Sequence, residues 1–179
     1  TAFDATTWLY ERASEIGSGG FIVEIGTWGG WTAAAMALGG PTVLSIDTFT
    51  MSGKHVETQA RGLQEMTPAV PRPGTLDLFA KRIATAGLGE RVVAVQAKSL
   101  DAATAMPQGI ADLVFIDGDH EPEAVREDVC AWAPVVRPGG LLCIDNWDLV
   151  KDAALPAWRE HCDEWSAPAE GCHQIWWTR

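Results

Sequence analysis

Two carboxylates and an imidazole follow one apolar run of this chain. The stretch 112–116 begins at Asp112, and its apolar residues Leu113–Ile116 end at Asp117-Gly118, with Asp119 and His120 next. A carboxylate can hold a cation or accept a proton, and an imidazole with its ordinary pKa near 6.5 exchanges a proton close to neutral pH. In open α/β sheets ligands bind beyond the carboxyl ends of the strands, so groups at such a place are positioned for chemistry. The alternative is a solvated turn, because Asp and Gly are ordinary turn residues.

A second polar pair, Asp145-Asn146, directly follows the apolar run 141–144. If this run and 112–116 are neighbouring parallel strands, their carboxyl ends lie side by side. We therefore expect Asp117 to lie near the pair, although 28 residues separate it from Asp145 in the sequence (145 − 117). A strand-ending turn is again the alternative.

Alternating strands and helices are needed to position these groups, and the hydrophobic pattern supplies them. The pattern predicts five strands, at 21–25, 42–46, 92–95, 112–116 and 141–144. It also predicts an opening helix from Asp4 to Gly17, helices at 31–38, 76–87 and 122–132, and a later helix that contains Trp158, Cys162 and Trp165. The last segments, 164–167 and 172–178, are expected to form an antiparallel pair at the sheet edge.

This order of elements predicts a single α/β domain over residues 1–179. We expect a doubly wound, Rossmann-like, seven-stranded and mostly parallel sheet with an antiparallel C-terminal strand and helices on both faces, preceded by an N-terminal helix within 1–20. The run Arg137-Pro138-Gly139-Gly140 is expected to turn the chain into the fifth strand. The polar, proline-containing segment 48–75, with a short helix near 56–66, is expected to be a lid or binding loop, or else mobile.

A glycine turn links the strand 21–25 to the alanine-rich helix 31–38, and this order forms the first half of a nucleotide-binding βαβ unit. A dinucleotide site needs the spacing G-x-G-x-x-G. The turn here has G-x-x-G-G and carries the bulky Thr27 and Trp28, which argues against NAD.

Two carboxylates flank this turn in the predicted fold. Glu24, two residues before Gly26, favours a positively charged ligand, because a cationic group would offset the cost of burying a carboxylate; nearby backbone donors are the alternative. Asp47 lies 21 residues after Gly26 (47 − 26), where a carboxylate can accept hydrogen bonds from both hydroxyls of a ribose.

In combination these motifs resemble those of the class I S-adenosylmethionine-dependent methyltransferases. The run 23–30 is similar to the first motif of that family, Asp47 to its acidic residue after the second strand, and 137–140 to its turn before the fifth strand. The resemblance implies S-adenosylmethionine as cofactor, held by Glu24, Gly26, Thr27, Trp28, Gly29, Asp47, Thr48, Ser99, Asp117 and Gly118. Ser99 resembles a position that contacts adenine, but a helix N-cap explains it equally well.

Within this family the chain resembles the cation-dependent O-methyltransferases of the catechol and antibiotic-sugar types. That resemblance implies Mg²⁺ held by Asp117, Asp145 and Asn146, and methyl transfer to a hydroxyl of a diol, catechol or sugar. His120 then occupies a place where related enzymes carry a basic residue, with Asp119 as the competing base. Asp117 binding the cofactor's amino group remains the alternative to a metal.

Three other functions stay open from the sequence: a metal-independent methyltransferase, a nicotinamide-dependent oxidoreductase, and a catalytically silent nucleotide-binding module. The segment 48–75 is expected to cover the acceptor, and the sequence leaves open whether a further lid precedes Thr1. Trp28, Trp31 and Trp147 lie near predicted strand ends, where they form either an aromatic wall for the ligands or ordinary packing.

The composition excludes some classes of binding partner. The net charge of −11 argues against nucleic acid, whose phosphates are neutralised by Lys and Arg. No apolar run is long enough for a transmembrane helix, and the first residues do not resemble a signal peptide. We expect a cytoplasmic protein with a small-molecule acceptor, and a homodimer is left open.

The cysteines, Cys130, Cys143, Cys162 and Cys172, lack CxxC spacing and favour reduced thiols, with a Cys162/Cys172/His173 metal site as a remote alternative.

Overall fold

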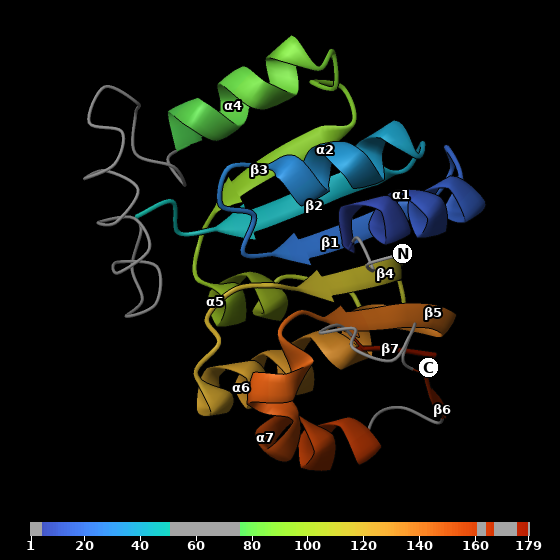
Figure 1. The fold of residues 1–179 in the computed structure, drawn as a ribbon, viewed down its shortest axis with the longest axis vertical. Coiled ribbons are helices and arrows are strands. Elements are labelled where there is room, and N and C mark those ends of the chain that lie inside the picture. The colour runs from blue at the N-terminus through green and yellow to red at the C-terminus, as the bar shows by residue number, and fades with distance from the viewer. Residues whose placement is uncertain (1–4, 51–75, 161–163, 167–174, 179) are drawn as a thin grey trace.

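The computed structural model describes residues 5–50, 76–160, 164–166 and 175–178, and these form a layered α/β fold (Figure 1). The strand order is β3-β2-β1-β4-β5-β7-β6. Five strands are parallel: β1 (Phe21–Ile25), β2 (Thr42–Asp47), β3 (Val92–Gln96), β4 (Ala111–Ile116) and β5 (Val136–Ile144). Beyond β5 the strands β7 (Ile175–Thr178) and β6 (Glu164–Ser166) pair antiparallel. The predicted α/β fold with a parallel sheet is confirmed.

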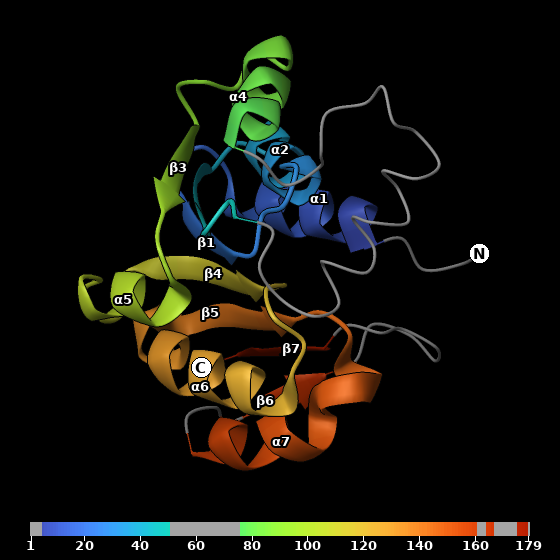
Figure 2. The same ribbon diagram turned by 90° about the vertical axis from the view of Figure 1, so that its left-hand side faces the viewer.

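Helices cover both faces of this sheet (Figure 2). One face carries α1 (Ala5–Ile16), α2 (Trp31–Leu38) and α4 (Leu76–Thr85). The other carries α5 (Ser99–Thr104), α6 (Pro122–Trp132) and α7 (Trp147–Arg159), with a short 3₁₀ helix, Ala133–Val135, after α6. The described residues contain no helix that is long and apolar enough to cross a membrane.

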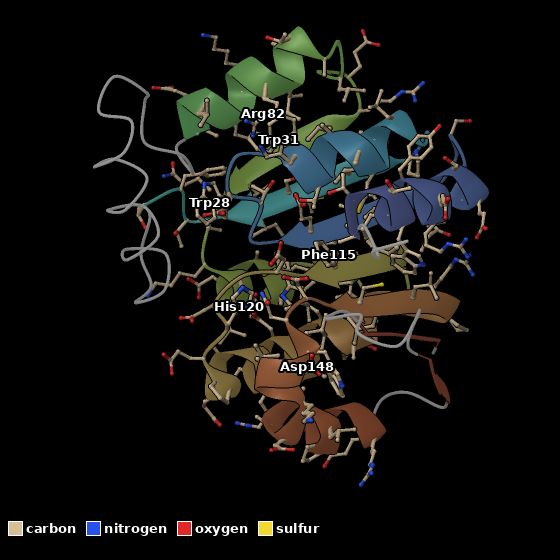
Figure 3. All side chains as sticks on the ribbon, viewed as in Figure 1. Trp28, Trp31, Arg82, Phe115, His120 and Asp148 are labelled. Carbon is tan, nitrogen blue, oxygen red and sulfur yellow. The ribbon has the colours of Figure 1, made fainter. Side chains whose placement is uncertain are left out.

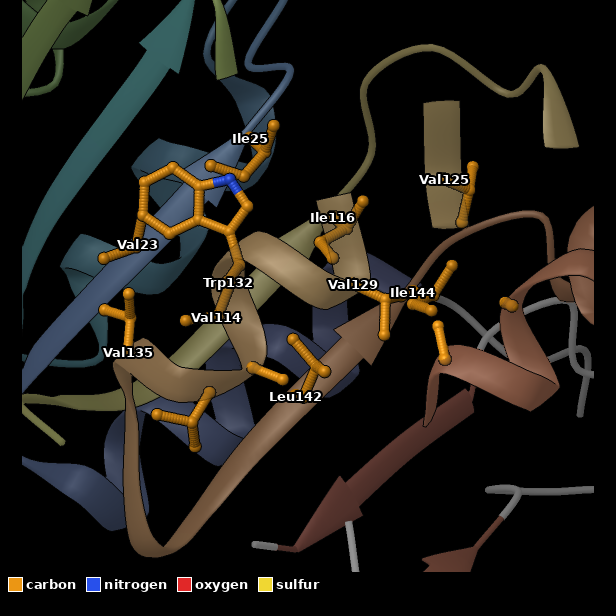
Figure 4. Packing of buried hydrophobic residues seen from close by; sticks show 14 of the residues in the cluster. Val23, Ile25, Val114, Ile116, Val125, Val129, Trp132, Val135, Leu142 and Ile144 are labelled. Atoms are coloured by element: carbon orange, nitrogen blue, oxygen red, sulfur yellow. The ribbon is translucent and has the colours of Figure 1, made fainter. Parts of the chain in front are cut away.

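Side chains alternate between two cores along the central strands, as the period of a strand requires. Val23 and Val114 point toward α6, where Trp132 packs against them (Figure 4). Ile22 points to the opposite core, beneath α1 and α2. Glu24 therefore faces α2, and this direction determines which groups it can meet in the site.

The start of β5 differs from the prediction. Arg137-Pro138-Gly139-Gly140 was expected to be a turn, but β5 begins at Val136, and the register with β4 shifts between Ala111 and Leu113. Gly139 has a φ of 74°, and a Cβ added to Gly140 would lie 2.8 Å from Val136 Cγ1. These two glycines let the chain stay against β4 through the irregularity, so the strand continues where turn residues predicted a break.

The C-terminal helix also differs from the prediction. α7 begins at Trp147, directly after Asn146, and ends at Arg159. Trp165 was expected both in this helix and in the edge strand 164–167, and it lies in β6, as the second expectation had it. The interval 160–163 separates the two elements, so a single helix through Trp165 is wrong. Residues 51–75, with the predicted lid and short helix, lie outside the described residues, as do Cys162, Cys172 and His173.

Candidate functional site

The carboxyl ends of the parallel strands meet at one edge of the sheet (Figure 1). The backbone is strained there. Among the described residues, the non-glycine residues with positive φ are Trp28 (47°), Phe49 (52°) and Asn146 (51°). They follow the ends of β1, β2 and β5, respectively. Such conformations are unfavourable for large side chains and concentrate at ligand sites, so this edge is the candidate site.

The glycine turn after β1 lies directly against the turn after β4. Gly26 has a φ of 81°, and a Cβ added there would overlap the Asp117 carbonyl oxygen and the Gly118 Cα. The Asp117 N–H donates to the Ile25 carbonyl at 2.8 Å, which fixes the same approach. The predicted cofactor turn and the predicted catalytic stretch therefore form one continuous site.

Asp47 connects the turns after β1 and β2. Its Oδ2 accepts a hydrogen bond from the Trp28 N–H at 3.0 Å, and its Oδ1 accepts one from the Phe49 N–H at 2.7 Å. The next residue, Thr48, accepts a hydrogen bond through its carbonyl from the Gln96 amide at 3.0 Å. A carboxylate offers about four lone-pair positions, so Asp47 keeps acceptor capacity for ribose hydroxyls.

Glu24 is fully buried and hydrogen-bonded by hydroxyl groups. It accepts hydrogen bonds from Thr32 Oγ1 of α2 and from Ser45 Oγ of β2, the latter at 2.9 Å. Burial raises the pKa of this carboxyl despite these donors. The sequence predicted a cationic ligand or backbone donors near Glu24; the donors that the structure shows are side-chain hydroxyls, from residues that the sequence analysis missed.

The register between β1 and β2 could have revealed Ser45. This residue pairs with Glu24 on the neighbouring strand, so its side chain points to the same face of the sheet. Thr32 is a polar residue in an otherwise apolar helix. In the turn itself Thr27 is 3% exposed, and its hydroxyl lies close enough to Glu24 to lower the pKa of that carboxyl. This hydroxyl makes no well-aligned hydrogen bond among the described residues, so it can still bind a polar ligand.

A second cluster lies at the ends of β4 and β5. Asp117, His120 and Asp145 each offer one ligand atom, and these atoms lie within 4.8 Å of one another. His120 Nε2 is 3.7 Å from Asp117 Oδ1. The Asn146 amide nitrogen lies 3.0 Å from His120 Nε2 and donates to Asp145 Oδ2 at 2.7 Å. The structure thus brings together the residues that the sequence predicted would meet across two strands, and it adds His120 to them.

Asp117 lies among other carboxylates in this cluster. The side chains of His120 and Asp117 are 22% and 28% exposed. Burial raises the pKa of Asp117 well above its ordinary value, and the carboxylates of Asp145 and Glu24 raise it further. Two adjacent carboxylates and an imidazole nitrogen are a donor set that a divalent cation would stabilise.

The competing base candidate, Asp119, lies apart from this cluster. It is exposed, and its Oδ1 accepts a hydrogen bond from the Glu121 N–H at 3.0 Å, just before α6. This contact is typical of a carboxylate that stabilises a chain turn. Of the two candidates, His120 is the one that contacts the ends of both strands.

Ser99 lies at the start of α5, with its hydroxyl directed toward α6. The hydroxyl donates to Asp128 and accepts a hydrogen bond from Trp132 Nε1 at 2.8 Å. The N-cap of α5 is Lys98, which makes no side-chain cap bond, so the N-cap explanation for Ser99 is wrong. Asp128 is 6% exposed, and burial raises its pKa to about 6.

The tryptophans near the strand ends have different surroundings. Trp147 belongs to the core beside α6 and α7, as the packing alternative predicted. Trp31 is 69% exposed, with Arg82 of α4 above its ring, while Trp28 is partly buried beside the end of β2 (Figure 3). Arg82 is another residue of this edge that the sequence analysis missed.

Known proteins match both the sequence and the fold. A family model described as a methyltransferase domain matches residues 23–147. A catechol O-methyltransferase from Mycobacterium tuberculosis is 29% identical over 126 residues, which cover 70% of this chain and 47% of that protein. The chain therefore spans about half the length of this curated relative.

Solved structures share the fold at low sequence identity. Cofactor-bound Rv0187 from MTB aligns with a TM-score of 0.64 and 21% identity, covering 99% of this chain and 81% of that one. The O-methyltransferase TomG from Streptomyces achromogenes, involved in tomaymycin synthesis and solved with S-adenosylmethionine, aligns with a TM-score of 0.62 and 19% identity over the same shares of the two chains. With its matching domain and its strand order, the chain belongs to the methyltransferase domain family, among the class I S-adenosylmethionine-dependent methyltransferases.

Proposed function

We propose that this chain transfers a methyl group from S-adenosylmethionine to a hydroxyl of a small molecule, such as a diol, catechol or sugar, with the help of Mg²⁺. The observation that carries the proposal is the contact between the glycine turn, where the cofactor is expected, and the turn that leads to the cluster of acidic residues and His120. The glycine turn after β1 touches the turn after β4, and that second turn leads into the cluster of Asp117, His120 and Asp145. A site of this form could hold a nucleoside cofactor beside the hydroxyl of an acceptor, with Asp117 and Asp145 placed to hold a cation next to it. The name of the catechol O-methyltransferase relative supports the same reaction class.

The residues around the glycine turn fit the cofactor. Gly26 allows the turn to lie against the turn after β4, Asp47 keeps acceptor capacity for ribose hydroxyls, and the buried Thr27 hydroxyl can bind a polar group. S-Adenosylmethionine, when bound, supplies a methyl group that an acceptor oxygen takes by in-line displacement of sulfur. The protein contributes mainly by orientation, because a correctly placed oxygen makes the displacement effectively unimolecular.

Asp117 and Asp145 are proposed to hold the cation. Asn146 would add an oxygen ligand after rotation of its amide, because the structure directs its nitrogen toward His120 and Asp145. Carboxylate and amide oxygens are the ligands that Mg²⁺ prefers, and a cation would offset the repulsion that raises the pKa of Asp117. The same charge would lower the pKa of a bound hydroxyl and so favour its deprotonation.

His120 is proposed to take the hydroxyl proton. With the Asn146 amide as donor, His120 Nε2 is the acceptor of their 3.0 Å hydrogen bond, and the neutral ring carries its proton on Nδ1. This hydrogen bond occupies the Nε2 lone pair, so the acceptor hydroxyl would have to replace the Asn146 N–H there before His120 could take its proton. Asp119 is exposed and accepts a backbone hydrogen bond, which favours His120 for this role.

Two measurements test this function. Isothermal titration with S-adenosylhomocysteine should show micromolar binding, whereas NAD should not bind. Methyl transfer to a panel of diols, catechols and sugars should stop with EDTA and return when Mg²⁺ is added back. Binding of NAD without S-adenosylhomocysteine would indicate a nicotinamide enzyme, and turnover that EDTA leaves unchanged would remove the metal from the mechanism.

A further inference from the structure

The glycine turn is contacted by a residue far from it in the sequence. The Arg82 guanidinium, on α4, donates a hydrogen bond to the Gly29 carbonyl. Its Cζ also lies 3.9 Å from the centroid of the Trp31 ring, at the first residue of α2 (Figure 3). One side chain therefore contacts both the turn and the start of the helix that follows it.

A second residue of α4 reinforces this contact. Phe79, one turn before Arg82, lies where a Cβ on Gly30 would come within 2.6 Å of its ring. The same ring meets Phe49 edge to face, with centroids 5.5 Å apart, and Phe49 follows β2. α4 thus braces the turns after β1 and β2, the two turns that Asp47 joins from inside.

The Arg82 contacts are chemically specific. The side chain is partly removed from water, and burial lowers the pKa of its guanidinium. A cation in such a place is stabilised by a carbonyl dipole and by the face of an indole ring, and Arg82 has both. Trp31 is 69% exposed, so the contact with Arg82, rather than core packing, accounts for its position.

We propose that Arg82 is a positioning residue for the cofactor: by fixing the Gly29 carbonyl and stacking on Trp31, it holds the turn 26–30 in its binding conformation. The inference rests on the proposed binding of S-adenosylmethionine. A glycine-rich turn has many accessible conformations when free, and ordering it on binding costs free energy. A turn that is already ordered avoids this cost and binds more tightly.

Arg82→Ala should raise the Kd of the whole chain for S-adenosylhomocysteine on the order of tenfold, because a charged hydrogen bond and a cation–π contact are lost. The KM for S-adenosylmethionine should rise with it, while kcat at saturating cofactor stays unchanged. Arg91→Ala is the matched control, since Arg91 donates to the Ala37 carbonyl, near the opposite end of α2, at 3.4 Å. That variant should bind the cofactor product as the original chain does.

Two further variants separate positioning from simple stability. Arg82→Lys should restore part of the affinity, because an ammonium can reach the carbonyl but cannot stack as a plane. Trp31→Ala should weaken binding, and its effect combined with Arg82→Ala should be smaller than the product of the two single effects. If Arg82→Ala does not fold, Arg82→Lys and Trp31→Ala decide the matter, and unchanged affinity in both would overturn the proposal.

The outcomes distinguish this inference from the proposed function. If the original chain fails to bind S-adenosylhomocysteine, the proposed function fails. If it binds and folded Arg82→Ala binds equally well, only the positioning role of Arg82 is overturned. A loss of kcat at saturating cofactor without a change in Kd would likewise contradict the proposal.

Discussion

At Gly26 the missing side chain lets the first turn of the site lie against the second. A Cβ there would overlap main-chain atoms of Asp117 and Gly118, and φ is 81°. Backbone atoms cannot move aside as the end of a flexible side chain can. Replacement by Ala therefore forces the turn after β1 away from β4.

We expect Gly26→Ala to lower the free energy of unfolding by about 2–4 kcal/mol and to weaken S-adenosylhomocysteine binding strongly. Urea unfolding and isothermal titration measure the two effects. Gly87→Ala is the control: φ there is 70°, but apart from its chain neighbours no atom of the described residues lies within 4 Å of the added Cβ. It should cost only about 1–2 kcal/mol and leave binding intact. Equal effects of the two variants would show that the close approach is unimportant.

His120 is the residue for which the proposed reaction predicts the largest loss of rate. His120→Ala should reduce kcat by about 10²–10⁴, because a general base contributes that much. Asp119→Ala, which changes an exposed carboxylate outside the cluster, should keep most of the activity. Mn²⁺ affinity of His120→Ala, measured by electron paramagnetic resonance, separates a base from a metal ligand. Near-normal turnover without His120 would transfer the role of base to Asp119 or to the metal alone.

At the scale of elements, the site is a set of turns tied to one another. Asp47 joins the turns after β1 and β2 from within the sheet edge, and α4 contacts the same two turns from outside. Glu24, Thr32 and Ser45 join β1, α2 and β2 beneath them. Each connection crosses between elements, so the geometry of the cofactor turn depends on the packing of at least three of them.

Asp47→Asn should weaken S-adenosylhomocysteine binding by about tenfold or more. An amide keeps one acceptor oxygen where the carboxylate has two, so it cannot serve both backbone N–H groups and a ribose. Asp112→Asn is the matched control, because Asp112 Oδ2 also accepts a backbone N–H, from Phe21 at 2.8 Å, but at the opposite end of the strands. It should lower stability without changing affinity. Unchanged affinity in Asp47→Asn would refute the ribose assignment.

At the scale of the whole molecule, buried carboxyls make stability depend on pH. Burial raises the Asp128 pKa from 3.8 to about 6, the Ser99 hydroxyl lowers it, and Glu127 and Asp119 raise it further. The folded chain therefore binds more protons than the unfolded chain between these values, so this group makes stability fall as pH rises from about 4 to about 6. Above about 6 its contribution is constant.

Asp128→Asn should remove that part of the pH dependence, which amounts to up to about 1.4 kcal/mol per pH unit in this range. Urea unfolding of both chains at several pH values between 4 and 7 measures the difference between them. Because Glu24 and Asp117 also have raised pKa values, the comparison with the variant, rather than the total slope, isolates Asp128. Parallel stability curves for the two chains would contradict a raised Asp128 pKa.

Much of this architecture could be predicted from local sequence. β1 and α2 have the predicted bounds, and Asp117 and Asp145 lie at the ends of adjacent parallel strands, as expected. The prediction failed at 137–140 and for the helix through Trp165. Residues that are typical of turns can form part of an irregular strand when a neighbouring strand pairs with them. The sequence of the segment alone does not show which strand will be its neighbour.

The sequence by itself determined which polar groups follow the ends of the strands, because the order of strands and helices and the residues at strand ends are properties of short segments. Only the tertiary structure decided which atoms meet there. His120 near Asp117 and Asp145, Gly26 beneath the Asp117 backbone, and Arg82 on the Gly29 carbonyl all depend on strand order, register and helix packing. The same packing determines burial, which shifts the pKa values of Glu24, Asp117 and Asp128. These contacts join residues far apart in the chain, and only their three-dimensional packing determines the distances between them.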